Sequence, residues 1–164
     1  MSKEENCIEK MVIRKMEAND ILILSELENR VFSVPWSKNM LFEELENENA
    51  IYLVATLDLK IVGYAGAWKI FDEGHITNVA VDPVFQRKGI GKILLSALLE
   101  SLTINSITKA TLEVRRGNVP AIKLYQLFGF QIEGIRKGYY SDNHEDALIM
   151  WLNMLDTNRY LPDS

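Results

Sequence analysis

The fold is decided by the stretch Asn78-Val79-Ala80-Val81-Asp82-Pro83-Val84-Phe85-Gln86-Arg87-Lys88-Gly89-Ile90-Gly91-Lys92. Its first residues form an apolar run that ends at an Asp-Pro pair, which predicts a strand over 75–81 followed by a turn. Beyond the glycines, apolar residues recur at helical spacing, which predicts a helix that starts near Gly89. The apolar stripe of this helix consists of Ile90, Ile93, Leu94, Ala97, Leu98 and Leu102.

The segment between this strand and helix, Gln86 to Gly91, predicts an anion-binding site. Glycine lets a backbone come close to a ligand and adopt dihedral angles that other residues avoid. The start of a helix offers free N–H groups and a partial positive charge, and Arg87, Lys88 and Lys92 add full positive charges. Such a site favours a pyrophosphate. A glycine-containing turn with solvated basic side chains fits the same residues.

Two common phosphate-binding motifs do not fit this loop. The dinucleotide fingerprint requires a third glycine where Leu94 stands. The P-loop requires a glycine at Gln86 and a serine or threonine at Ile93. The residues therefore argue against both motifs and leave open an anion site of another kind or a glycine-containing turn with solvated basic side chains.

The same rules predict seven strands and four helices around this unit. Short turns join the three middle strands, which favours an antiparallel meander, whereas the strand–helix–strand unit predicts one parallel pair. We therefore expect a mixed, mostly antiparallel sheet with helices on its faces, an α/β (α+β) fold. Caps are predicted at Asn19-Asp20 and Ser37, and turns at Asp58-Leu59 and Asp72-Glu73-Gly74. The predicted strands are 11–16, 51–57, 60–71, 75–81, 110–114, 130–139 and 147–154, and the helices are 20–31, 37–45, 89–102 and 120–128.

Length and composition favour one globular domain. The 164 residues match the size of a single domain, and a hydrophobic content of 48% is enough for a full core. We expect one domain over 1–164, with a core of about 12–154 and mobile ends at 1–7 and 157–164. No apolar segment reaches the ~18 residues of a membrane helix, and the N-terminus lacks a signal-peptide pattern. We therefore expect a cytoplasmic protein that does not enter membranes.

The charge and the cysteine content limit the binding partners and the covalent cross-links that we expect. The net charge of −5 argues against a nucleic-acid binder and is compatible with a cationic partner such as an amine. The single cysteine, Cys7, excludes a disulfide framework. No cluster of histidine, cysteine and carboxylate residues has metal-ligand spacing, so we expect no metal. The oligomeric state stays open between a monomer and a weak homodimer.

The loop and two further segments resemble a known family. Gln86 to Gly91 matches the Gln/Arg-x-x-Gly-x-Gly/Ala motif of the GCN5-related N-acetyltransferases (GNAT family), and the preceding Asn78 to Pro83 resembles that family's fourth strand. The segment from Asn118 to Phe130 is similar to its second cofactor segment, so the resemblance spans about 12–154. It implies the GNAT fold and acetyl-CoA as the acetyl donor. It further implies cofactor contacts at Val79, Ala80, Val81, Gln86, Arg87, Lys88, Gly89, Ile90, Gly91, Lys92, Asn118 and Tyr125.

The resemblance narrows to one subgroup, the bacterial ribosomal-protein-alanine N-acetyltransferases of the RimI type. It implies transfer of an acetyl group to the N-terminal α-amine of a ribosomal protein, by direct attack in a ternary complex. A small amine or a lysine side chain is an alternative acceptor, and a non-catalytic acyl-CoA-binding module is an alternative of another class. The segments that carry this similarity are Pro35-Trp36-Ser37, Leu112-Glu113-Val114-Arg115, Asn118, Leu124-Tyr125, Gly138-Tyr139-Tyr140 and Glu145-Asp146-Ala147.

Acetyl transfer to an amine needs a base and an acid, and the sequence offers one candidate for each. Strand alternation places Glu113 opposite Leu112 and Val114, and the resemblance makes it the proton acceptor. A solvent-facing glutamate is the structural alternative. Tyr125 lies on the apolar stripe of its helix, which fits a core tyrosine, and the resemblance makes it the proton donor to the thiolate. Cys7 lies far from every motif, which disfavours a covalent route.

Several further residues complete the predicted site. Asn118 fits both a helix N-cap and a contact to the cofactor. His75 is the rival base, with Glu73 beside it, because an unperturbed histidine titrates near neutral pH. By resemblance, a backbone N–H on the strand around Ala80 would meet the oxyanion. Residues expected to line the acceptor groove, or else to pack in an ordinary way, are Trp36, His75, Tyr139 and Tyr140, while His144 is expected in a loop.

Overall fold

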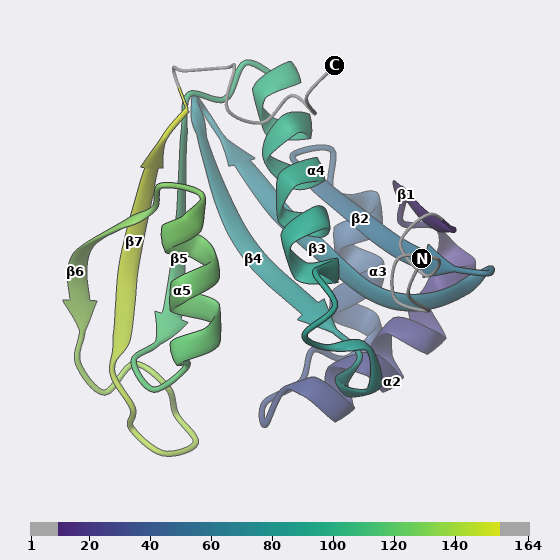
Figure 1. Cartoon of the computed structure of the whole chain (residues 1–164), viewed down its shortest axis with the longest axis horizontal. Coiled ribbons are helices and arrows are strands. Elements are labelled where there is room, and N and C mark those ends of the chain that lie inside the picture. The colour runs from purple at the N-terminus through teal and green to yellow at the C-terminus, as the bar shows by residue number, and fades with distance from the viewer. Residues whose placement is uncertain (1–9, 155–164) are drawn as a thin grey trace.

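The computed structural model describes residues 10–154, which form one seven-stranded sheet with helices on both faces (Figure 1). The sheet order is β1-β2-β3-β4-β5-β7-β6. The strands are β1 (Met11–Lys15), β2 (Ala50–Leu57), β3 (Lys60–Ile70), β4 (Glu73–Val81), β5 (Lys109–Arg115), β6 (Gln131–Arg136) and β7 (Ala147–Asn153). The helices are α2 (Ile21–Val31), α3 (Lys38–Glu46), α4 (Ile90–Ile104) and α5 (Val119–Leu127), with 3-10 turns η1 (Ala18–Asp20) and η2 (Pro83–Phe85).

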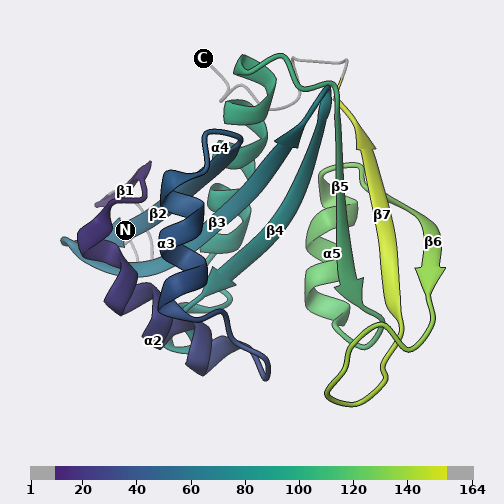
Figure 2. The same cartoon turned by 180° about the vertical axis from the view of Figure 1, so that it is seen from behind.

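One parallel pair interrupts an otherwise antiparallel sheet, as the strand–helix–strand unit predicts. β4 pairs with β5 in parallel only from Glu73–His75 against Lys109–Thr111. Beyond His75 the two strands diverge and the sheet splits into a V, which Figures 1 and 2 show from both sides. A bulge in β4 between Ile76 and Asn78 bends the strand near the start of this split.

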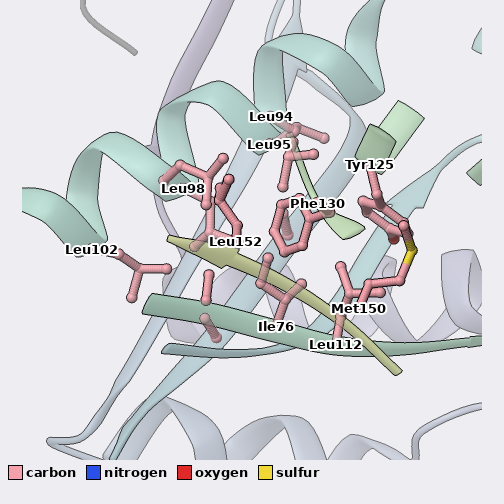
Figure 3. Close-up of a cluster of buried hydrophobic side chains, with 14 of the residues drawn as sticks. Ile76, Leu94, Leu95, Leu98, Leu102, Leu112, Tyr125, Phe130, Met150 and Leu152 are labelled. Atoms are coloured by element: carbon pink, nitrogen blue, oxygen red, sulfur yellow. The ribbon is translucent and has the colours of Figure 1, made fainter. Parts of the chain in front are cut away.

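Two hydrophobic clusters hold the layers together on opposite faces of the sheet. α4 and α5 cover one face, where Leu94, Leu98 and Leu102 of α4 pack against the sheet (Figure 3). α2 and α3 cover part of the other face, where Leu24 and Leu41 are fully buried. The face that α2 and α3 leave uncovered belongs to β5, β7 and β6 (Figure 2).

Most predicted elements are confirmed within about two residues, and the differences have local causes. The turn before β4 is at Phe71-Asp72, with Phe71 at φ 56°, so β4 begins at Glu73 rather than His75. β6 ends at Arg136 rather than Tyr139, because its pairing with β7 stops at the Arg136–Ala147 partners. Residues 1–7, 157–164 and Cys7 lie outside the described part of the chain.

The two predicted helix caps differ in outcome. Ser37 caps α3, since its hydroxyl accepts a hydrogen bond from the Met40 N–H at 3.2 Å. Asp20 stands at the N-cap position of α2, as predicted, but its side chain makes no capping hydrogen bond to that helix. A 3-10 turn precedes α2, and the Asp20 carboxylate binds the Arg14 guanidinium at 2.8 Å and the Glu17 N–H at 2.7 Å. The Arg14 side chain holds the pKa of Asp20 below its ordinary value.

Candidate active site

The loop between β4 and α4 leaves the first turn of α4 open to a ligand. Gly89 occupies the N-cap position at φ 81° and has no side chain to cap the helix. The free N–H groups of that turn and the helix dipole therefore point toward any anion placed there. Arg87 also has a positive φ of 63°, so the loop curls around the helix start. The Gln86 amide fixes the loop to β4 by donating to the Val81 carbonyl at 3.2 Å.

Both glycines of the loop fit a bound pyrophosphate. A Cβ built on Gly89 meets no atom within 4 Å, so the space beside it is free. A Cβ on Gly91 would make only ordinary contacts, 3.6 Å to Leu124 and 3.7 Å to Val81. Packing within the protein therefore does not require glycine at position 91, and a glycine there would let a ligand come close to the backbone. Acetyl-CoA fits this arrangement.

The split between β4 and β5 leaves an edge of β4 unpaired next to this loop. From Ile76 onward β4 has no ladder partner in β5, although β3 still pairs with its other edge through Val81. A main-chain edge of this kind can pair with an extended molecule as another strand would. Val79, Ala80 and Val81, the predicted cofactor contacts, lie on this part of β4.

Glu113 is placed as strand alternation predicts. Leu112 and Val114 are buried under α4 and α5, whereas the Glu113 side chain lies on the opposite face and is 31% exposed. Its carboxylate forms an ion pair of 3.5 Å with the Arg136 guanidinium from β6. The predicted base is thus accessible from the uncovered face of the sheet and has a cation beside it.

Tyr125 lies on the other face of β5 from Glu113. Its ring packs edge-on against Phe130, with ring centres 5.8 Å apart, within the larger hydrophobic cluster (Figure 3). Burial, with a smaller contribution from Tyr140, raises the pKa of the Tyr125 phenol well above its ordinary value. This group therefore stays protonated at neutral pH, as a proton donor must. Glu113 lies two residues beyond Thr111, the last residue of β5 that pairs with β4.

Asn118 begins α5, and its N-cap role is confirmed. Its side-chain oxygen accepts a hydrogen bond from the Ala121 N–H at 3.3 Å. The contact to the cofactor stays a prediction. The amide nitrogen is not used by the cap, so the two predicted roles are compatible.

His75 lies where β4 and β5 still pair, with Thr111 as its partner in β5. Its Nε2 atom is 3.3 Å from the Glu73 carboxylate, and its ring is edge-on to Trp151 at 6.5 Å between centres. His75 and Glu113 lie on the same face of the sheet, because Thr111 and Glu113 are two residues apart in β5. The role of His75 as a rival base stays a prediction.

The loop between β6 and β7 holds Tyr139 and Tyr140, whose rings meet edge-on at 5.1 Å. Arg115, at the end of β5, organises this loop. Its guanidinium lies 3.9 Å from the centre of the Tyr140 ring and forms ion pairs of 2.9 Å with Asp142 and 3.2 Å with Glu145. Burial raises the pKa of Tyr140 to about 12, and the Arg115 charge partly opposes this shift.

Trp36 packs against the smaller hydrophobic cluster, on the face that α2 and α3 cover. The Trp36 ring packs against Tyr52 at 6.3 Å between ring centres, and the backbone N–H of Trp36 donates to the buried Glu28 carboxylate at 3.0 Å. The connector between α2 and α3 instead reaches the β6–β7 loop through Ser33, whose hydroxyl donates to Asp142 at 2.6 Å.

Sequence reasoning missed Ser33, Arg115, Arg136 and Asp142 as site residues. Alternation does place Arg115 on the face of Glu113, which is the one available signal. The other three depend on loop conformation and on the pairing of β6 with β7. Within residues 10–154, no group of three histidine, cysteine or carboxylate side chains could hold a metal, and no helix is long and apolar enough to cross a membrane.

Comparison with known proteins identifies a family whose model matches this chain and several similar proteins. The model of the acetyltransferase (GNAT) family matches residues 21–130. A provisionally named [ribosomal protein bS18]-alanine N-acetyltransferase of Bacillus subtilis is 41% identical over 146 residues, covering 88% of this chain and 97% of the relative.

Solved structures agree with this result. The ribosomal-protein-S18-alanine N-acetyltransferase of Escherichia coli superposes with a TM-score of 0.81 at 34% identity, over 87% of this chain and 93% of the other. The PaiA N-acetyltransferase of Thermoplasma acidophilum, solved with coenzyme A, has a TM-score of 0.75 at 22% identity, over 87% and 98% of the two chains. The second likeness concerns the fold alone.

Proposed function

The chain belongs to the acetyltransferase (GNAT) family and is an N-acetyltransferase, and from this premise we propose that it acetylates the N-terminal α-amine, an alanine, of ribosomal protein bS18. The single observation that carries the choice of acceptor is the similarity to relatives named for that reaction, at 41% and 34% identity over most of both chains. A ribosomal acceptor places the reaction in the cytoplasm.

The donor in this proposal is acetyl-CoA, which supplies the acetyl group as a thioester. The loop residues Arg87 and Lys88, with the N–H groups at the start of α4, would hold its pyrophosphate. The free edge of β4 from Val79 to Val81 would pair with its extended arm. Asn118 would contribute its unused amide nitrogen.

The acceptor amine would reach the donor from the uncovered face of the sheet. Glu113 takes the proton from the amine, directly or through a water molecule, because it is the carboxylate on that face of β5 beside the split between β4 and β5. An α-amine with a reference pKa of about 7.7–8.0 needs only a modest push near neutral pH. Tyr125 gives its proton to the departing thiolate from the other face. No covalent intermediate is needed when both substrates bind together.

The test is an acetylation assay with two peptides. One carries the mature N-terminus of bS18 from the same organism, and the other is the same peptide with its α-amine blocked. Spermidine serves as a small-amine competitor. With acetyl-CoA, we expect a mass increase of one acetyl group on the α-amine of the free peptide alone. Acetylation of the blocked peptide or of spermidine, without acetylation of the free α-amine, would remove this proposal.

A further inference from the structure

The ion pair between Glu113 and Arg136 places a permanent positive charge where the acceptor amine must lose its proton. Arginine keeps its charge at any pH at which the protein is folded. The distance of 3.5 Å and the 55% exposure of Arg136 describe a weak, solvated pair rather than a buried structural one. The pair is therefore not explained by stability alone.

The register of the sheet directs Arg136 toward Glu113. Arg136 and Arg115 both have Ala147 of β7 as their strand partner, so all three lie on the face of Glu113. The small side chain of Ala147 lets Arg136 extend across β7. Two residues along β5, Glu113 is opposite Ile149 of β7. The partner of Ile149 in β6 is Gly134, so β6 has no side chain there that could compete for Glu113.

A second contact keeps the Arg136 guanidinium in place. It lies 5.6 Å from the centre of the Tyr139 ring, within the range of a cation–π interaction. Arg136 can thus remain beside the site even when an acceptor contacts Glu113. Arg115, the other arginine on this face, is neutralised by Asp142 and Glu145. Within residues 10–154, Glu113 is the one carboxylate paired with Arg136.

We propose that Arg136 is a specificity-determining residue, whose charge beside Glu113 disfavours a protonated amine and so selects α-amines over lysine side chains. The inference rests on the proposed function, in which Glu113 faces the acceptor amine. At pH 7 roughly one α-amine in ten is neutral, against roughly one lysine amine in a few thousand, given reference pKa values of about 8 and 10.4. A neutral α-amine enters beside Arg136 without charge repulsion, and Glu113 takes its proton as the nitrogen attacks the thioester. A lysine amine enters as a cation, and the positive charge of Arg136 repels it.

The experiment measures kcat/KM for two peptides that differ in the position of the amine. One has a free N-terminal alanine and no lysine, and the other has a blocked N-terminus and one lysine near it. The enzymes are the wild type, Arg136→Gln, and Arg136→Lys as the control that keeps the charge. We expect the ratio of α-amine to lysine kcat/KM to fall by about tenfold in Arg136→Gln, since one unit charge at several ångströms has an effect of this order. Arg136→Lys should keep the wild-type ratio.

The outcomes separate this inference from the proposed function. An unchanged ratio in Arg136→Gln, with α-amine acetylation still measurable, would overturn the selectivity role and leave the proposed function intact. An equal fall for both peptides also leaves the ratio unchanged, and would reduce Arg136 to a general contact for the acceptor. If the wild type acetylates lysine and no α-amine, the proposed function fails and the inference with it. Because the pair is exposed, Arg136→Gln should fold, which its thermal unfolding checks.

Discussion

The hydroxyl of Ser33 donates a hydrogen bond of 2.6 Å to the carboxylate of Asp142, although the two residues are 109 positions apart in the chain. The bond joins the α2–α3 connector to the β6–β7 loop. Arg115 binds the same Asp142 oxygen at 2.9 Å, so β5 is part of the same network. Hydrogen bonding by Ser33 and Arg115 holds the pKa of Asp142 below its ordinary value. The network connects both segments that flank the uncovered face around Glu113.

Ser33→Ala should weaken acceptor binding without affecting the donor. Loss of one hydrogen bond to a partly exposed carboxylate should raise the acceptor KM roughly three- to tenfold, while the KM for acetyl-CoA stays constant. Steady-state kinetics with each substrate varied in turn measures both constants. Ser37→Ala is the matched control, because it removes the α3 cap and should lower stability by about 1 kcal/mol with no change in acceptor KM. Equal acceptor KM values in the two variants would contradict the role of Ser33.

Glu113→Gln should lower kcat at least a hundredfold, because the amide cannot accept the amine proton. Acetyl-CoA affinity, measured by calorimetry, should not change, since Glu113 lies on the face opposite α4 and α5. His75→Gln is the comparison. If Glu113→Gln retains wild-type turnover and His75→Gln loses it, His75 replaces Glu113 as the base.

Tyr125→Phe should lower kcat by one to two orders of magnitude and leave both KM values near those of the wild type. The hydroxyl makes no hydrogen bond within residues 10–154, so its removal should cost little stability. Rapid-mixing kinetics combined with thermal unfolding separates the two effects. A Tyr125→Phe enzyme with full kcat would show that another group, or water, protonates the thiolate.

Gly91→Ala should reduce cofactor affinity while slightly stabilising the fold. The new Cβ has room in the protein, at 3.6 Å from Leu124, and alanine favours a helix over glycine by about 0.5–1 kcal/mol. The methyl group would, however, occupy space beside the free N–H groups of the first turn. We expect a KM for acetyl-CoA at least tenfold higher and a free energy of unfolding that is equal or greater. Unchanged affinity would show that the cofactor does not approach Gly91.

Stability should fall at alkaline pH. Burial raises the pKa of Tyr52, Tyr64, Tyr125 and Tyr140, the last to about 12. At a pH below the unfolded-state pKa of about 10, each tyrosine is protonated in both the folded and the unfolded state. Tyrosine ionisation therefore does not change the free energy of unfolding in this range. Above it, the unfolded chain ionises first, and each tyrosine lowers stability by up to about 1.4 kcal/mol per pH unit.

Urea unfolding at pH 9 and pH 10.5 measures this loss. Tyr125→Phe should lose less stability than the wild type over the same interval, because one raised pKa is gone. Lysine titration is common to both proteins and cancels in the comparison. An identical loss in the two proteins would mean that the Tyr125 phenol ionises as readily in the folded state as in the unfolded one.

The residues that the sequence predicts correctly are those whose placement follows from a local pattern. The face of Glu113 follows from alternation along one strand, and the caps at Ser37 and Asn118 follow from the side chain and the next few residues. The parallel β4–β5 pair follows from the intervening helix. None of these depends on which distant segment is nearby.

The residues that the sequence does not reveal depend on register between distant strands. Arg136 reaches Glu113 only because β7 lies between β5 and β6 and places Ala147 beneath it. Ser33 meets Asp142 only because two loops end on the same side of the split sheet. A shift of one residue in the β6–β7 register would move Arg136 to the other face, and no local pattern excludes such a shift.

The central claim is that Glu113 and the open face of β5 serve an α-amine acceptor. The most direct measurement is peptide-level mass spectrometry of purified, unacetylated bS18 after incubation with acetyl-CoA and either the wild type or Glu113→Gln. The account predicts one acetyl group, on the N-terminal alanine, with the wild type and at least a hundredfold slower labelling with Glu113→Gln. Wild-type labelling on lysine side chains with the N-terminal alanine unmodified would contradict it.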